Sequence, residues 1–165
     1  MSNGNVVFRI PTPTFGGGLI DNITDDTIVA NKNASQQRKA ALGISGHENR
    51  NPNDGTITKF GWKAQNRSLL MFSGEAYNVE MGVTNELFSG ERNADPSCAF
   101  NNGPEDHLEF DDNSANGGVT SGTQNFTTFM RLLAPPAPAP DTPSIANGRR
   151  CLRPSAVRCA THRRC

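Results

Sequence analysis

Residues that break helices and strands are spread along this chain of 165 residues, and they leave room for few long regular elements. The sequence contains 16 glycines and 11 prolines, and asparagine is frequent as well. All three residue types favour turns. Apolar residues make up 35% of the chain, whereas globular domains have roughly 45–50%. We therefore expect a loop-rich protein with a small apolar core.

Three segments carry helix signals, so the expected fold class is mainly α, with few short helices and little strand. Residues 24–31 predict a short helix, because Thr24 suits an N-cap and two aspartates follow it at the positive end of the helix dipole. Residues 68–82 place apolar side chains at roughly helical spacing, although Gly74 interrupts them. Residues 123–134 predict the clearest helix.

The helix predicted at 123–134 is amphipathic. Apolar residues recur in it at positions i, i+3, i+4 and i+7, namely Phe126, Phe129, Met130 and Leu133. Pro135 and Pro136 follow and end the helix. This spacing predicts a single apolar stripe along one side of the helix.

The remaining stretches predict loops. Residues 1–23 are expected to be extended and turn-like, because the glycines at 16–18 interrupt any regular element. Residues 43–61 predict a loop, and residues 83–122 form a polar stretch that is either functional or disordered. No run approaches the roughly 18 apolar residues of a membrane span. The first ten residues lack the basic and apolar pattern of a secretory signal, so we expect none in the chain as written.

Charge and cysteine divide the chain into two compositions. Residues 1–148 carry a net charge of −6, and residues 149–165 carry +6. The same short tail holds three of the four cysteines, Cys151, Cys159 and Cys165. A proline-rich segment of the kind that forms semi-rigid linkers precedes it. We therefore divide the chain into residues 1–133, a Pro-rich linker at 134–148 and a basic Cys-rich tail at 149–165.

The tail offers ligands for a metal ion. Three cysteines and one histidine could together hold zinc, namely Cys151, Cys159, His162 and Cys165. The gap between the first two cysteines is wider than in most structural zinc sites. Nucleic acid is not an expected partner, because no aromatic residue accompanies the basic residues to stack on bases.

Two further motifs are weak. Asp112 begins a match to the first positions of a calcium-binding EF-hand loop, but Thr123 stands where a bidentate glutamate is needed. The glycines at 16–18 lack the lysine of a phosphate-binding loop, so they predict a turn. His47 and His107 are expected to be surface loop residues.

Three long segments point to a known family. They are FRIPTPTFGGGLIDNI (8–23), DGTITKFGWKAQNRSLLMFSGEAYNVEMGVTNELF (54–88) and FMRLLAPPAPAPDTP (129–143). The chain resembles, over roughly residues 5–148, the di-haem c-type cytochrome family of peroxidase-like oxidoreductases, often labelled thiol oxidoreductases. The resemblance implies a mainly helical, cytochrome-c-like region and export to the periplasm. It also implies two haems, each bound covalently by a Cys-x-x-Cys-His motif.

The chain departs from the family pattern at these haem motifs, because no Cys-x-x-Cys-His occurs in it. We interpret residues 1–133 as an incomplete middle segment. It is truncated at the N-terminus, so that the first haem motif of the family is missing. The codons of PSAVRCATHRRC (154–165), read from their third base, permit Ile-Gly-Cys-Ala-Leu-Cys-His. That peptide is a haem-attachment motif at the place where the family has its second one. We therefore expect a shifted reading frame after about residue 149, which makes the Cys-rich tail an accident.

The resemblance suggests two residues near haem. Met81 is a candidate axial ligand, because a thioether suits haem iron; a core methionine is the alternative. Trp62, the one tryptophan of the sequence, is a candidate electron-transfer bridge between haems. A packed aromatic beside a glycine turn is the alternative there. Cys98 has no evident partner and is expected to be a lone thiol.

The predicted function is that of a fragment of a di-haem c-type cytochrome oxidoreductase with peroxidase-like electron transfer. The chain is expected to be inactive as written and to bind no haem covalently, because both haem motifs are absent. The family implies haem c as cofactor and an electron-donor protein or small-molecule oxidant as partner. Two alternatives stay open: a small Cys/His zinc module and a haem-free structural protein.

Overall fold

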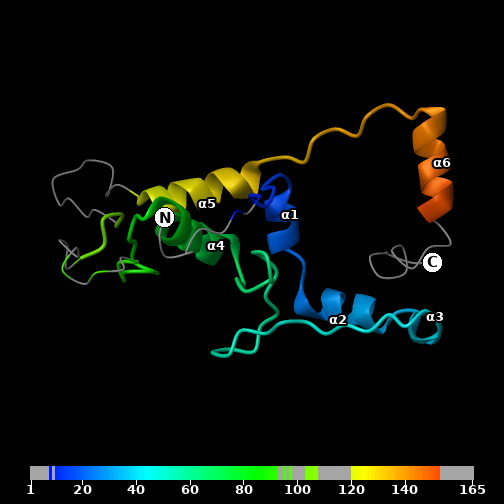
Figure 1. Ribbon diagram of the computed structural model, residues 1–165, viewed down its shortest axis with the longest axis horizontal. Helices are drawn as coiled ribbons and strands as arrows, with labels where there is room; N and C mark the ends of the chain where they lie inside the picture. The colour runs from blue at the N-terminus through cyan, green and yellow to red at the C-terminus, as the bar shows by residue number, and fades with distance from the viewer. Residues whose placement is uncertain are drawn as a thin grey trace.

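The computed structural model of the chain describes residues 8, 10–92, 95, 97, 103–107 and 120–152, and the regular elements there are helices (Figure 1). These are α1 (Gly17–Asp21), α2 (Asp25–Asn33), α3 (Gln36–Ala41), α4 (Leu69–Ala76), the π-helix η1 (Tyr77–Met81), α5 (Gly122–Leu132) and α6 (Pro143–Leu152). Within these residues β pairing is limited to isolated bridges, such as Phe60 with Asn66. The prediction of a mainly α, loop-rich fold is confirmed.

Helices α1, α4 and α5, together with η1, form the packed part of the molecule. Helix α5 lies along α4, and α1 lies beside the C-terminal end of α5 (Figure 1). The apolar core between them consists of Phe60, Leu69 and Met130, with Phe72 packed against it. The core is small, as expected from the low apolar content of the sequence.

Glycine lets α1 approach α5 closely. A Cβ atom placed on Gly18 would lie 2.1 Å from the carbonyl oxygen of Arg131. The Gly16 amide donates to the carbonyl oxygen of Leu133 at 2.9 Å, which fixes the start of α1 to the end of α5. The prediction that residues 1–23 are extended is therefore wrong at α1. Close helix packing, and not only a turn, requires the glycines there.

The other predicted helices are confirmed. Helices α4 and η1 together correspond to the helix predicted at 68–82, and α5 corresponds to the one predicted at 123–134, although it ends at Leu132. Each begins at a serine N-cap. The Ser68 hydroxyl accepts from the amide three residues later at 3.2 Å, and the Ser121 hydroxyl does the same at 3.3 Å.

Helices α2 and α3 form an arm that extends away from the packed helices (Figure 1). Neither helix contains a buried residue. The helix predicted at 24–31 is confirmed as α2, with the Thr24 hydroxyl accepting from the Thr27 amide at 3.3 Å. Asp25 ties the arm to the body, because its carboxylate accepts from the Ile57 amide at 2.9 Å.

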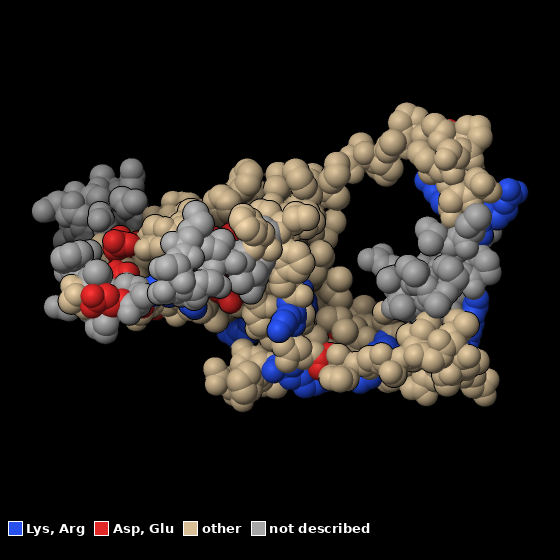
Figure 2. Space-filling view, in the orientation of Figure 1, with Lys and Arg blue, Asp and Glu red and all other residues tan. Residues whose placement is uncertain are grey.

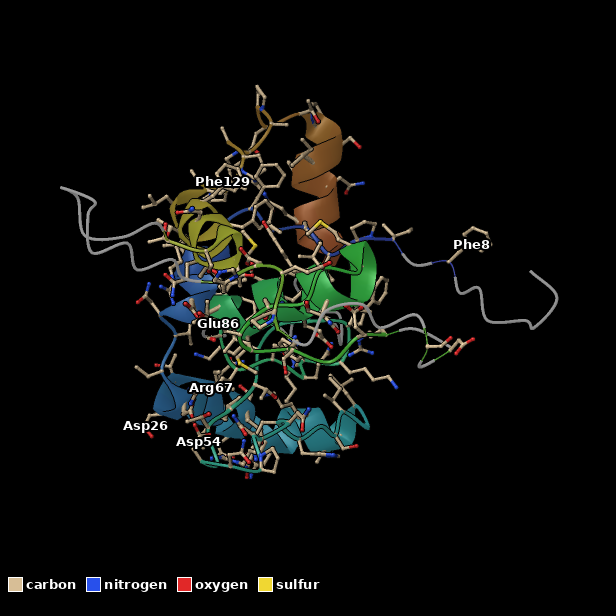
Figure 3. All side chains as sticks on the ribbon, turned by 90° about the vertical axis from the view of Figure 1, so that its left-hand side faces the viewer. Phe8, Asp26, Asp54, Arg67, Glu86 and Phe129 are labelled. Carbon is tan, nitrogen blue, oxygen red and sulfur yellow. The ribbon has the colours of Figure 1, made fainter. Side chains whose placement is uncertain are left out.

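The loop predicted at 43–61 contains no helix and is held by side-chain contacts. The Asp54 carboxylate accepts from the Thr56 amide at 3.1 Å and forms an ion pair with Arg67. Figure 3 shows Arg67 and Asp54 near each other. The loop therefore has a defined path between the arm and α4.

An exposed proline-rich segment, residues 134–142, runs from α5 to α6 (Figure 1). Helix α6 begins at Pro143, and the Thr142 hydroxyl accepts from the Ile145 amide at 3.2 Å. A proline in the first helical position after a threonine cap is a common helix start. Helix α6 continues past residue 148, the predicted end of the linker. The division of the chain into three units stays a prediction.

Some predictions concern residues that lie outside the described part of the chain. They include the lone thiol Cys98, the calcium motif at Asp112, and the tail residues Cys159, His162 and Cys165. In the part that is described, no helix has the length and apolar character needed to cross a membrane.

Candidate functional site

Three aromatic rings from η1 and α5 form a continuous surface. The Tyr77 ring contacts Phe126 edge-on, with ring centroids 6.2 Å apart, and Phe126 contacts Phe129 at 5.8 Å. Phe126 and Phe129 are 45% and 53% exposed, and Figure 3 shows Phe129 on the outer side of α5. We call Tyr77, Phe126 and Phe129 the aromatic face. Contiguous exposed apolar surface of this kind is typical of a binding site.

Helix α5 uses a different side to pack on α4. The buried residues of α5 are Thr123, Thr127 and Met130. The Ser73 hydroxyl of α4 donates to the carbonyl oxygen of Thr123 at 3.2 Å, so small side chains let the two helices approach closely. The apolar stripe predicted for this helix is therefore present, but its centre is offset from the side that packs on α4. Met130 enters the core, while the two phenylalanines lie on an adjacent side that solvent reaches.

Met81 lies at the end of η1. The i to i+5 hydrogen bonds of a π-helix put Met81 about one turn after Tyr77, on the same side of the helix. Met81 is 57% exposed, so the core alternative is wrong for this chain. Single π-helical turns occur frequently at functional sites. The role of Met81 as a haem ligand stays a prediction.

Trp62 lies in the turn that follows Gly61, whose φ of 89° favours glycine. The tryptophan is 56% exposed, so the alternative of a packed aromatic is also wrong for this chain. In the described part of the chain, no hydrogen bond or ring contact joins Trp62 to Met81 or to the aromatic face. The structure therefore does not bring the two predicted site residues together, and the bridging role of Trp62 stays a prediction.

Asp106 holds the N-terminus of α5 in place. One carboxylate oxygen accepts from the Gly122 amide at 2.6 Å, and the other accepts from the amide and hydroxyl of Thr123 at 2.8 and 2.5 Å. Burial raises the pKa of the Asp106 carboxyl, but the hydrogen bonds from Thr123 and Gly122 outweigh it, so the pKa lies below its ordinary value. A carboxylate at a helix N-terminus also complements the helix dipole.

A buried amide network fixes the segment that follows η1. Asn85 is 1% exposed. Its side-chain NH₂ donates to the carbonyl oxygen of Gly74 at 2.8 Å, and its side-chain oxygen accepts from the amides of Leu87 and Phe88, both at 3.1 Å. Asn78 donates to the carbonyl oxygen of Gly90 at 3.0 Å. Together these bonds hold the segment after η1 against α4 and η1.

A comparison with protein families identifies the kind of protein that carries this surface. A family model described as di-haem oxidoreductase, putative peroxidase, matches residues 3–104. The chain belongs to the di-haem oxidoreductase family. No curated protein and no solved structure matches it. The matched range of this di-haem oxidoreductase includes Trp62, Tyr77 and Met81 and ends before α5.

The residues of this di-haem oxidoreductase fit one part of a haem site. The covalent part does not fit, because the sequence contains no Cys-x-x-Cys-His. The non-covalent part fits, because an exposed thioether at Met81 and the aromatic face offer a soft ligand and apolar surface. Among the described residues, no three His, Cys, Asp or Glu side chains are grouped as a metal site.

Sequence reasoning missed two residues of this site. Tyr77 could have been found, because it lies four residues before Met81 in a predicted helix and therefore on the same side. Asp106 gave no local signal, because its partners are 16 and 17 residues away along the chain. His47 and His107 are exposed, as predicted.

Proposed function

We propose that this chain supplies the apolar, non-covalent wall of a haem site in a di-haem c-type cytochrome oxidoreductase with peroxidase-like electron transfer. The observation that carries the proposal is the position of Met81, exposed and on the same side of η1 as Tyr77. Membership of the di-haem oxidoreductase family supplies the identity of the ligand. The haem, when bound, supplies the redox chemistry.

The chain's own residues have separable roles in this proposal. Met81 offers its sulfur to the iron, and a thioether ligand raises the reduction potential of haem. The aromatic face excludes water from one side of the site. Asp106 holds the N-terminus of α5, and the buried amide of Asn85 holds the segment after η1 on α4. Trp62 is exposed and is proposed as an electron-transfer bridge between haems.

We further propose that the chain has no activity alone and that its covalent haem motifs are encoded outside the reading frame given. The support is the absence of Cys-x-x-Cys-His together with the codon argument for residues 154–165. Sequencing the gene tests this directly. A Cys-x-x-Cys-His in the overlapping frame, and a periplasmic signal in the complete gene, are the expected results. An overlapping frame without that motif would contradict the shifted frame.

Spectroscopy of the chain with added haemin tests the role of Met81. We expect non-covalent binding that acid–acetone removes, with the charge-transfer band of a thioether bound to ferric iron. Met81→Leu should abolish that band. Met71→Leu is the matched control, because Met71 is half-buried in α4 and should leave the band unchanged. Identical spectra for Met81→Leu and the unmodified chain would refute the ligand role.

A further inference from the structure

A groove of about 590 Å³ lies in the arm, between α2, α3 and residues 44–48. It is lined by the apolar residues Ile28, Ala40 and Ile44 and by the polar residues Lys32, Lys39, His47 and Glu48. This volume falls within the roughly 300–1,000 Å³ of small-molecule sites. No residue of the aromatic face lines the groove, so it is a separate site from the proposed haem wall.

The groove carries surplus positive charge. The lining holds two lysines, Lys32 and Lys39, and one carboxylate, Glu48. That carboxylate accepts from Lys32 at 2.7 Å and from Arg50, outside the lining, at 2.9 Å. The Lys32 and Arg50 contacts help lower the pKa of Glu48 to about 2, which keeps this carboxylate charged. The Lys39 ammonium donates to the carbonyl oxygens of Asn31 and Lys32 at 2.8 and 3.1 Å. Both carbonyl oxygens are neutral, so they accept hydrogen bonds from Lys39 without neutralising its positive charge.

Surplus positive charge is unusual among residues 1–148. Residues 1–148 have a net charge of −6. In Figure 2, Lys and Arg atoms are frequent along the lower edge where the arm lies, whereas Asp and Glu atoms gather at the opposite end. An ammonium group has three donors, so Lys32 and Lys39 both keep donors beyond the bonds described. The groove thus combines cationic donors with apolar side chains in its lining.

We propose that this groove binds a small amphipathic carboxylate, an organic anion with an aliphatic body. The carboxylate accepts hydrogen bonds from Lys39 and Lys32, and the aliphatic body lies over Ile28, Ala40 and Ile44. Charge-assisted hydrogen bonds fix the head group, and burial of the aliphatic body adds affinity. The proposal is independent of haem, because no residue named for the haem wall contributes to it.

Octanoate and its uncharged analogue 1-octanol are the probes that test this proposal. Titration of the chain, followed by NMR of the backbone amides of residues 44–48, locates binding as well as measuring it. We expect octanoate to shift these amides and to bind about tenfold more tightly than octanol, because a hydrogen bond to a charged group is worth about that factor. Equal affinity for the two probes, or no octanoate-induced shifts, would overturn the proposal.

Two variants separate the head-group contact from the lining. Lys39→Met should weaken octanoate binding about tenfold, whereas Lys63→Met, an exposed lysine outside the groove, should not change it. Since Lys39 also caps α2, Ala40→Trp gives an independent check. It fills the groove and leaves both Lys39 hydrogen bonds in place, so it should abolish octanoate binding without loss of helix by circular dichroism. Unchanged affinity in Ala40→Trp would refute the assignment of the groove.

Discussion

Replacing Asp106 by alanine should release the N-terminus of α5 from the body of the protein. The carboxylate accepts three hydrogen bonds from two consecutive residues, Gly122 and Thr123. Thr123 is itself 3% exposed, so loss of its partner leaves buried polar groups without one. The aromatic face depends on this anchor, because Phe126 stands one turn after Thr123 on the same helix.

The expected magnitude follows from the number and kind of these bonds. Loss of a helix N-cap costs about 0.5–2 kcal/mol, and a hydrogen bond to a charged group contributes about 1.5–3 kcal/mol. Since Ser121 still caps the helix through Gln124, we expect a net loss of about 2 kcal/mol for Asp106→Ala. Amide hydrogen exchange in α5, followed by NMR, should accelerate roughly thirtyfold at neutral pH.

A matched control is Asp95→Ala. Asp95 also has a lowered pKa, but its carboxylate bonds only to the neighbouring Ser97 in the described contacts. Exchange in α5 should be unaffected by this change. If Asp106→Ala accelerates α5 exchange no more than Asp95→Ala does, the anchoring role of Asp106 is refuted.

The pH dependence of the unmodified chain provides a second readout of the same contact. The folded pKa of Asp106 lies below its ordinary value. The stabilisation is therefore fully present above the unfolded pKa of about 3.9 and is lost as pH falls through the folded pKa. Protection of α5 against exchange should decrease in that acidic range. The acid-dependent decrease should be absent in Asp106→Ala.

Three further predictions concern packing, charge and folding. Gly18→Ala should destabilise the docking of α1 by about 1–3 kcal/mol, because its Cβ would meet the backbone of Arg131. Gly17→Ala should be tolerated, because its closest contact is the flexible Leu69 side chain at 3.3 Å and backbone lies no nearer than 3.8 Å; thermal melts compare the two. Glu48 should titrate by carboxyl NMR with a midpoint of about 2, and Lys32→Met should raise that midpoint. The contribution of Glu48 to stability is therefore fully present above the unfolded pKa of about 4.3 and is lost as the pH falls towards 2. The chain expressed with cytochrome maturation machinery should carry no covalent haem and unfold with weak cooperativity; a sharp denaturant transition together with a covalent Soret band would contradict this.

Among the described residues, three of the four helices whose starts carry a side-chain cap could be predicted from the sequence; α6, capped by Thr142, lies largely in the segment predicted as linker. Thr24 and the segments beginning at Ser68 and Ser121 mark α2, α4 and α5, because a cap and the following spacing are local signals. Helix α3 was not predicted, since it begins at Ser35 in a left-handed conformation without a side-chain cap bond. Helix α1 was not predicted either, because its glycines are used for contact with Arg131, far away in sequence.

The candidate site could be predicted only in part, for a similar reason. Met81 and Trp62 were proposed from a family resemblance, and both prove to be exposed in the structure. The anchoring of α5 by Asp106 depends on a contact across a long polar stretch, which no local pattern reveals. Periodicity correctly placed α5 but not its buried side. Hydrophobicity alone ranks Phe126 above Thr127, whereas close packing on α4 selects the smaller residue.

Helix α5 buries Thr127 and leaves Phe126 and Phe129 partly exposed. The stability of the chain therefore depends on whether a ligand or partner covers the aromatic face. Full burial of a phenylalanine side chain contributes about 1.5–3 kcal/mol, and about half of the surface of Phe126 and Phe129 remains exposed. Much of that contribution is therefore still to be gained when a ligand or partner covers the two rings. Because the apolar core within the described residues is small, this gain is large relative to the marginal stability of a domain of this size. A molecule that binds the aromatic face should therefore raise the unfolding temperature of the chain, and Phe129→Ala should reduce that rise while leaving the buried face of α5 intact.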